Sequence, residues 1–304
     1  LMTPHLRTVR IRRWQKIIDA TVNDAVDRAA AEGSVEFVRA IAAPIPIRVL
    51  GQVVGVPIED CDLLFDWTNR VVSDDPEFMR SPDEKERARS EMFAYFEDLT
   101  EQRRRSAQED LVSILVRSSI DGEPLTWQDL AAYYFVLIGA GNETTRNLMT
   151  GSVLAFEEHP GEYTRLRQDP ALVGPAVEEL LRYFSPVRAF RRNALRDVEW
   201  YGQTIAKGDK VVLWFESANR DERIFPAPDQ LILDRSPNEH LAFGWGIHGC
   251  MGSHLARAET QTLLRVLNER RLVVRPAGPP DRLHSNQFNG IKRLPVVIEP
   301  APGA

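Results

Sequence analysis

Apolar residues recur at helical spacing through the first half of the chain. They predict a helix over residues 9–26 that ends at Gly33, two shorter helices within residues 45–65, a charged amphipathic helix over residues 80–105 and another helix over residues 110–119. A long apolar helix is predicted for residues 127–156, with Thr126 and Asp129 as its capping box, and a further helix for residues 172–184. This part of the chain therefore indicates a mainly helical protein.

The pattern changes after Ser185. Short apolar runs predict strands at residues 198–200, 203–205 and 210–214, around turns at Gly202 and Gly208. An irregular, proline-rich stretch covers residues 225–237, a helix returns at residues 253–268, and strands follow at residues 272–274 and 294–298. Because no internal repeat or low-complexity linker interrupts the chain, we predict a single domain over residues 1–304, mainly α with a small β portion.

Composition narrows the class of protein. The 304 residues are 43% hydrophobic and 27% charged, which is enough for a sizeable core. With 38 basic and 44 acidic residues, the net charge of −6 argues against a dedicated nucleic-acid-binding protein. The longest uncharged apolar stretch, residues 131–141, is too short to cross a membrane. Cys61 and Cys250 cannot form a disulfide framework, so we expect a reducing, cytoplasmic location. The run Arg103-Arg104-Arg105 is interpreted as a solvated helix end.

The residues from Phe243 to Gly252 read F-G-W-G-I-H-G-C-M-G. The plain interpretation is a glycine loop with a buried cysteine, and three functional interpretations compete with it. The glycines spell the G-x-G-x-x-G of a dinucleotide loop, although only a three-residue apolar run precedes them. His248, Cys250 and His254 could instead ligate zinc, although their spacing is not a recognised zinc pattern.

A thiolate ligand to haem iron is the third interpretation. Cys250 comes directly before a predicted helix, where backbone N–H groups and the helix dipole favour an anion. Glycines around it would let a flat cofactor approach without Cβ clashes. N–H groups of such a loop could also donate to the sulfur and tune the iron.

The pattern F-G-x-G-x-H-x-C-x-G resembles the haem-binding loop of the cytochrome P-450 enzymes, the haem-thiolate monooxygenases. The resemblance implies the cytochrome P-450 fold and a haem b whose iron takes the Cys250 thiolate as its axial ligand. It further implies that His248 binds a haem propionate and that Phe243 packs beside the sulfur. Gly244 and Gly252 would belong to the same cofactor-binding loop.

Three further motifs carry the resemblance. Residues 140–145, A-G-N-E-T-T, are similar to the family's oxygen-activating helix, which implies that Ala140 and Gly141 border the oxygen pocket. Glu143 and Thr144 would then be the catalytic residues that relay protons. Residues 179–182 form an E-x-x-R, and residues 217–221, S-A-N-R-D, also match the family.

Other site residues follow from the same resemblance. Glu179, Arg182 and Arg235 would form a buried structural triad, and Arg192 would bind a haem propionate. Residues 285–292 resemble the last substrate-contacting turn. The implied pocket residues are Val187, Ala189, Phe190 and Phe288, with Arg188 either meeting an acidic substrate group or turning outward.

The reaction implied by the resemblance is the insertion of one oxygen atom from O2 into an apolar small molecule such as a steroid, a lipid or a terpenoid. Electrons would come from NAD(P)H through a ferredoxin-type donor and its reductase, with Arg257 as a docking candidate. No nucleic acid and no membrane is expected as a partner. The alternative is an inactive or non-catalytic haem- or ligand-binding remnant of the same fold.

Residues 1–5 resemble the start of a helix that follows the family's N-terminal, haem-contacting helices. The resemblance therefore implies that those helices, part of a sheet and part of the pocket roof are missing from this chain. On this basis we expect weak haem retention and low activity unless that part is supplied.

Overall fold

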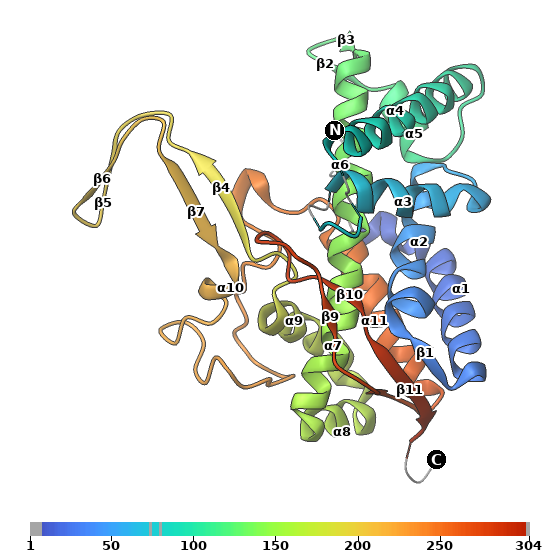
Figure 1. Cartoon of the computed structure of the whole chain (residues 1–304), viewed down its shortest axis with the longest axis vertical. Helices are drawn as coiled ribbons and strands as arrows, with labels where there is room; N and C mark the ends of the chain where they lie inside the picture. The colour runs from blue at the N-terminus through green and yellow to red at the C-terminus, as the bar shows by residue number, and fades with distance from the viewer. Residues whose placement is uncertain (1–7, 73–74, 79–80, 302–304) are drawn as a thin grey trace.

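The computed structural model describes residues 8–72, 75–78 and 81–301. The N-terminal prediction rests on residues 1–5, which lie outside this range. A body of helices makes up most of the molecule (Figure 1). These helices are α1 (Thr8–Glu32), α2 (Pro44–Val54), α3 (Cys61–Val72), α4 (Pro82–Arg105), α5 (Leu111–Val116), α6 (Trp127–Gly141), α7 (Glu143–Glu158), α8 (Pro160–Gln168), α9 (Val173–Phe184) and α11 (Ser253–Glu269).

The helices form where the apolar spacing predicts them. α1 packs along α11 and α2 and buries Ile18, Val22 and Val26. It ends at Gly33, whose φ of 72° is readily adopted only by glycine. Thr126 and Asp129 form the predicted capping box at the start of α6. Among the α-helices of the described residues, α8 and the short α10 (Phe215–Ala218) have no counterpart in the sequence prediction.

The charged end of α4 differs from its prediction. Arg103 is buried, and its guanidinium donates to the Asp110 carboxylate and to the Gly55 carbonyl, the latter at 2.7 Å. Arg104 and Arg105 are exposed, as predicted. The interpretation of the whole run as a solvated helix end is therefore wrong for Arg103, because the α4–α5 turn brings an acidic cap back onto it.

The long helix predicted for residues 127–156 is interrupted at Asn142, between α6 and α7. Just after the break, the Thr144 hydroxyl donates to the Ala140 carbonyl at 2.9 Å, a side-chain bond that bends helices. Asn142 is fully buried, and both polar atoms of its side chain lack a partner within the described residues. A Cβ at Gly141 would meet the Leu50 side chain at 2.9 Å, so close packing on α2 requires glycine there.

The β portion is small and antiparallel. One three-stranded sheet has the order β1 (Ser34–Glu36), β11 (Pro295–Pro300), β8 (Leu272–Pro276), with Val35 opposite Val296. The hairpin-like pairs are β2 (Ser119–Ile120) with β3 (Glu123–Pro124), β4 (Ala189–Asn193) with β7 (Lys210–Trp214), β5 (Val198–Trp200) with β6 (Gln203–Ile205), and β9 (Asp281–Arg282) with β10 (Ile291–Arg293). The predicted fold class, mainly α with a small β portion, is confirmed.

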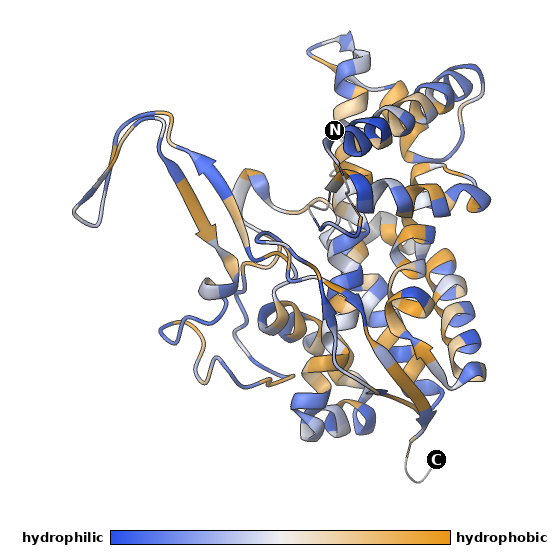
Figure 2. Cartoon of the chain, viewed as in Figure 1, coloured by the Kyte–Doolittle hydropathy of each residue, from blue (hydrophilic) through white to orange (hydrophobic). Residues whose placement is uncertain are grey.

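The strands β4, β5, β6 and β7 form an arm that projects from the helical body (Figure 1). Figure 2 shows β7 as a hydrophobic strand on this arm, and Val212, Leu213 and Trp214 are exposed on it. The short helix α10 (Phe215–Ala218) connects the arm to the irregular stretch. Among the helices of the described residues, none is both long and apolar enough to cross a bilayer.

Glu259 is a buried acid in α11 that gives the fold a pH dependence. Burial raises the pKa of Glu259 from 4.5 to about 8, and its Oε2 has no partner among the described residues. The folded chain therefore binds a proton at Glu259 that the unfolded chain releases above about pH 4.5. Consequently this group lowers the stability as the pH rises from about 4.5 to 8.

We predict that Glu259→Gln raises the free energy of unfolding by about 2 to 4 kcal/mol near pH 7.5, and that the gain disappears near pH 4.5. Urea unfolding at several pH values measures this. Glu269→Gln, on the exposed end of the same helix, is the control and should show no such gain. A gain for Glu259→Gln that does not change with pH would contradict the prediction.

Candidate functional site

The cysteine loop connects the irregular stretch to α11. Its short helical turn η5 (Gly246–His248) follows Gly244 and Gly246, which adopt φ values of 69° and 63°. The Cys250 N–H donates to the Phe243 carbonyl at 2.8 Å and closes the loop. Cys250 then stands three residues before the start of α11 at Ser253, with its side chain exposed.

The sulfur of Cys250 lies at a helix N-terminus. The backbone N–H groups of Gly252 and Ser253 donate to it. Desolvation by the surrounding chain raises the pKa of the Cys250 thiol, while these N–H groups and the charge of Arg257 act in the opposite direction. Cys61 differs, since it is buried and burial raises its pKa to about 11.

The two other interpretations of the loop fail on geometry. No strand precedes Gly244, so the loop lacks the βαβ setting that a dinucleotide loop requires. Within residues 8–72, 75–78 and 81–301, no group of three His, Cys, Asp or Glu side chains could hold a metal ion, which excludes zinc ligation by His248, Cys250 and His254. The geometry of the described residues therefore supports neither a dinucleotide loop nor a zinc site, and haem ligation by Cys250 stays a prediction.

Glu179, Arg182 and Arg235 come together as the sequence predicts. Glu179 and Arg182 are fully buried, and the Arg182 Nε and Nη2 atoms each donate to the Glu179 carboxylate at 2.8 Å. Arg235 Nε donates to the same carboxylate at 3.1 Å. The backbone of Ile232 and the side chain of Asn238 complete the shell of donors around Glu179.

This buried ion pair also organises the irregular stretch. Arg182 donates to the carbonyls of Asn219, Pro228 and Gln230 at 2.8–3.0 Å. The Asn219 side chain in turn accepts the Leu241 N–H at 2.7 Å, two residues before Phe243. A chain of hydrogen bonds therefore runs from α9 to the cysteine loop.

Arg257, the docking candidate, makes two kinds of contact within the protein. Its guanidinium lies over the Phe243 ring at 4.4 Å from the centroid. Its Nε and Nη2 atoms donate to Glu178 at 2.7 and 2.8 Å. Desolvation opposes the charge on Glu178, but the hydrogen bonds from Arg257 and His240 outweigh it and hold the pKa of Glu178 near 2.

The structure separates the two predicted proton-relay residues. Glu143 is buried, and its carboxylate accepts from the Arg146 guanidinium and from Asn147 Nδ2, the latter at 3.0 Å. The hydroxyl of Thr144 instead lies on the exposed side of the helix, next to exposed Ala140. The sequence analysis did not name Arg146, although Glu143 and Arg146 have the same E-x-x-R spacing as Glu179 and Arg182.

Three of the four predicted pocket residues are buried, and two of them form one cluster. Val187 and Phe288 face each other in an isolated β-bridge. They pack with Phe215 and Leu283, which the sequence analysis missed because irregular segments carry no apolar period. Ala189 is buried in β4, and Phe190 is exposed with its ring edge-to-face to Phe215.

Two arginines near this cluster differ in their partners. Arg188 donates from Nη2 to Asn289 Oδ1 at 3.2 Å, and its Nε lies 3.5 Å from the Glu216 carboxylate. That Nε atom is itself buried, so both alternatives for Arg188 stay predictions. The guanidinium of Arg192 makes its only hydrogen bond within the described residues to the neighbouring Arg191 carbonyl. Its charge has no acidic partner there and is available to an anion.

These residues fit the haem that the resemblance implies. The loop offers an exposed thiol at a helix N-terminus, and Arg192 and the exposed His248 offer donors for carboxylates. Large apolar side chains are exposed on α6, on β7 and on the loop, and a bound haem could shield such side chains from water. They are Phe135, Val136, Leu213, Trp214, Trp245 and Ile247.

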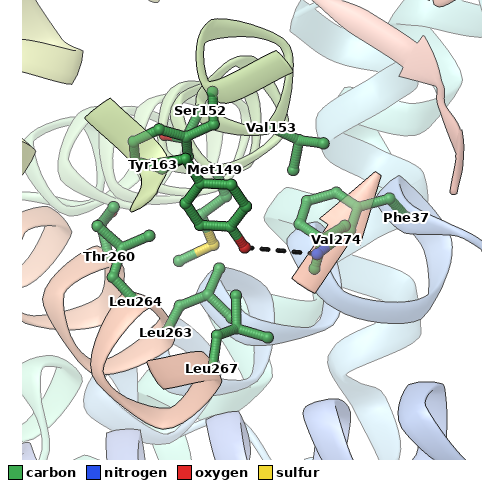
Figure 3. A pocket seen from close by; sticks show the side chains of 11 residues that line it. Phe37, Met149, Ser152, Val153, Tyr163, Thr260, Leu263, Leu264, Leu267 and Val274 are labelled. Carbon is green, nitrogen blue, oxygen red and sulfur yellow. Dashed lines mark hydrogen bonds between the residues drawn. The ribbon is translucent and has the colours of Figure 1, made fainter. Parts of the chain in front are cut away.

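The enclosed cavity of the body is a separate feature. Its volume is about 20 Å³, and residues of α7, α11 and their neighbours line it, including Met149, Leu263 and Leu267 (Figure 3). Tyr163 reaches across it and accepts the Val274 N–H at 3.4 Å. It holds at most a single water molecule, and no predicted site residue lines it.

Comparisons with known proteins identify the family. The sequence model of the family described as Cytochrome P450 matches residues 76–295. Linalool 8-monooxygenase of Pseudomonas putida is 34% identical over 301 residues, which cover 99% of this chain and 74% of the relative. Steroid C26-monooxygenase of Mycobacterium tuberculosis is 35% identical over 303 residues, which cover 96% of this chain and 80% of the relative. The solved structure of P450BioI in complex with hexadec-9Z-enoic acid ligated acyl carrier protein matches with a TM-score of 0.91 and 34% identity, over 98% of this chain and 78% of that one.

We predict that Arg182→Met lowers the free energy of unfolding by about 3 to 5 kcal/mol, because the buried Glu179 carboxylate loses its two hydrogen bonds from Arg182 and keeps only Arg235 as a charged partner. It should also expose the irregular stretch to proteolysis between residues 219 and 240. Urea unfolding and limited proteolysis measure the two effects. Arg89→Met, which breaks an exposed pair with Glu86, is the matched control and should change neither. Equal effects of the two substitutions would contradict a central role for Arg182.

Proposed function

The chain belongs to the cytochrome P450 family, and on that premise we propose that it is a monooxygenase whose haem iron is ligated by the Cys250 thiolate. The observation that supports this best is the exposed sulfur at the N-terminus of α11, with two backbone N–H groups directed at it. Membership of the family makes the protein an oxidoreductase of the monooxygenase type, and the family implies a haem-thiolate cofactor.

When bound, such a haem activates dioxygen, and its thiolate ligand favours cleavage of the O–O bond. The reaction sends one oxygen atom to the substrate and the other to water, and it consumes two electrons and two protons. In this chain, Gly252 and Ser253 orient the sulfur through their N–H groups. Arg192 and His248 would bind the haem propionates, and Ala140 and Gly244 would provide surfaces without bulky side chains, whereas Gly141 packs against Leu50 of α2.

Proton delivery falls mainly to Thr144. Its hydroxyl is on the exposed side of the helix break and needs only a rotation about χ1 to leave the Ala140 carbonyl. The Glu143 carboxylate is held by Arg146 and Asn147 and must leave them before it can pass a proton toward Thr144. Thr144 is therefore the residue that meets the reacting atoms, and Glu143 would pass a proton to it after leaving Arg146 and taking up a proton from solvent.

The substrate is an apolar small molecule of the steroid, lipid or terpenoid class. Val187 and Phe288 pack with Phe215 and Leu283 into an apolar wall. The relatives support the same class, since their names specify linalool and a steroid, and the matched structure contains a hexadec-9Z-enoic acyl chain.

Electrons come from NAD(P)H through a separate ferredoxin-type protein and its reductase. The two cysteines of this chain are too few for an iron–sulfur cluster, which takes four protein ligands. The cysteine loop and the start of α11 remain accessible in the structure, with Trp245, Ile247 and His248 exposed.

We predict that the haem-reconstituted, reduced protein gives a strongly red-shifted Soret band with carbon monoxide, and that Cys250→Ala abolishes this shift. The difference spectrum measures it directly. Cys61→Ala is the control and should keep the shift, because Cys61 is buried and its thiol donates a hydrogen bond to the Pro57 carbonyl. A Soret band at the ordinary position in the parent chain would instead indicate a haem-binding protein without thiolate ligation.

We also predict that Thr144→Ala raises the hydrogen peroxide released per NAD(P)H consumed by at least about twofold, because the proton donor nearest the reaction is lost. Thr144→Ser should restore most of the coupling. Thr145→Val, which removes the neighbouring buried hydroxyl, should leave the coupling unchanged. Unchanged coupling in Thr144→Ala would contradict the role given to Thr144.

A further inference from the structure

Two consecutive acids on α9 anchor two different parts of the molecule. Glu179 binds Arg182 and Arg235 and holds the irregular stretch. Glu178 faces the cysteine loop and binds Arg257 of α11 and His240. The pair of acids therefore connects α9 both to the stretch that precedes the loop and to the helix that follows it.

The contacts of Glu178 have well-defined geometry. Arg257 donates to it twice, from Nε at 2.7 Å and from Nη2 at 2.8 Å, which fixes the plane of the guanidinium. His240 Nδ1 accepts the Ala242 N–H at 3.3 Å, so its Nε2 carries the proton that is donated to Glu178 at 3.1 Å. The His240 side chain is almost completely buried.

The side chains of Arg257 and His240 both lie next to the ring of Phe243. The guanidinium plane of Arg257 lies 4.4 Å from the centroid of its ring, and the His240 ring lies 6.1 Å away. The backbone of the same residue holds the cysteine, because the Phe243 carbonyl accepts the Cys250 N–H. Fixing the ring of Phe243 therefore restrains the carbonyl to which Cys250 is bound.

Other arginines of α11 and its end do not share this arrangement. Arg265 pairs with Asp19 and Glu269, and Arg270 pairs with Asp27, all through side chains that are at least 37% exposed. The Arg257 side chain is 28% exposed and contacts an aromatic ring as well as an acid. Ordinary surface pairing therefore does not account for Arg257.

We propose that Arg257 is a positioning residue for Cys250: held by Glu178, it clamps the Phe243 ring and thereby fixes the loop that presents the sulfur. The proposed function supplies the reason why the position of the sulfur matters, but the clamp itself consists of protein groups only. It can thus be measured on the chain without haem.

The experiment is amide hydrogen exchange at single-residue resolution on the haem-free chain. In Arg257→Gln, the Cys250 amide should exchange about three to thirty times faster, the range that corresponds to a cation–π contact. Amides in the second half of α11, such as that of Leu263, should not change. Arg257→Lys keeps a cation near the ring and should retain most of the protection, whereas Arg265→Gln is the matched control and should have no effect.

A double-mutant cycle adds a readout that a general loss of stability would not move. Phe243→Leu should speed the exchange of the Cys250 amide, and Arg257→Gln should add little in that background. Additive effects, equal exchange in the Lys and Gln variants, or a Cys250 amide already unprotected in the parent chain would each overturn the proposal. None of these results bears on thiolate ligation, which the carbon monoxide spectrum tests separately.

Discussion

The buried ion pair of Glu179 and Arg182 is the constraint on which the functional half of the molecule depends. Removing two charges from water costs several kcal/mol per ion, and their attraction offsets this only when the remaining donors and acceptors are also satisfied. Here they are satisfied, because three carbonyls accept from Arg182 and a ring of donors surrounds the Glu179 carboxylate. Those partners come from residues 219–238, so a segment without helix or strand obtains a fixed path. That path delivers the chain to Leu241 and the cysteine loop.

The break between α6 and α7 shows the opposite treatment of polar groups. Asn142 is buried with both side-chain polar atoms unpartnered among the described residues, a costly arrangement in a packed interior. Beside it, the Thr144 hydroxyl donates a hydrogen bond to the helix backbone, and the Glu143 carboxylate points into the protein and accepts from Arg146. Unsatisfied groups of this kind are where a helix can rearrange, and proton transfer requires such a rearrangement. The buried charged groups of Glu179 and Arg182 on α9 are thus hydrogen-bonded, whereas the side chain of Asn142 at the break between α6 and α7 is not, within the described residues.

The sequence was sufficient wherever a local rule decided the outcome. Apolar periods located most of the helices, the capping box located the start of α6, and motif resemblance brought Glu179, Arg182 and Arg235 together before any coordinates. It was insufficient where distant segments decide. The strand β1 exists because it pairs with β11 more than 250 residues later, and no local pattern encodes that pairing. The partners of Arg103 and Arg257 are likewise set by how helices pack, so the sequence suggested a solvated helix end for Arg103 and a docking surface for Arg257.

The state of the Cys250 thiol connects these observations to function. Its two backbone donors and the nearby Arg257 favour an anion, yet desolvation is the larger effect and raises the pKa of the thiol. The loop therefore shapes and orients the sulfur, and a coordinated metal would take the thiol as its thiolate. The protein itself must therefore set the position of the Cys250 sulfur. Both acids of α9 contribute to this: Glu179 holds the segment that leads to the cysteine loop, and Glu178 binds Arg257 of the helix that follows the loop.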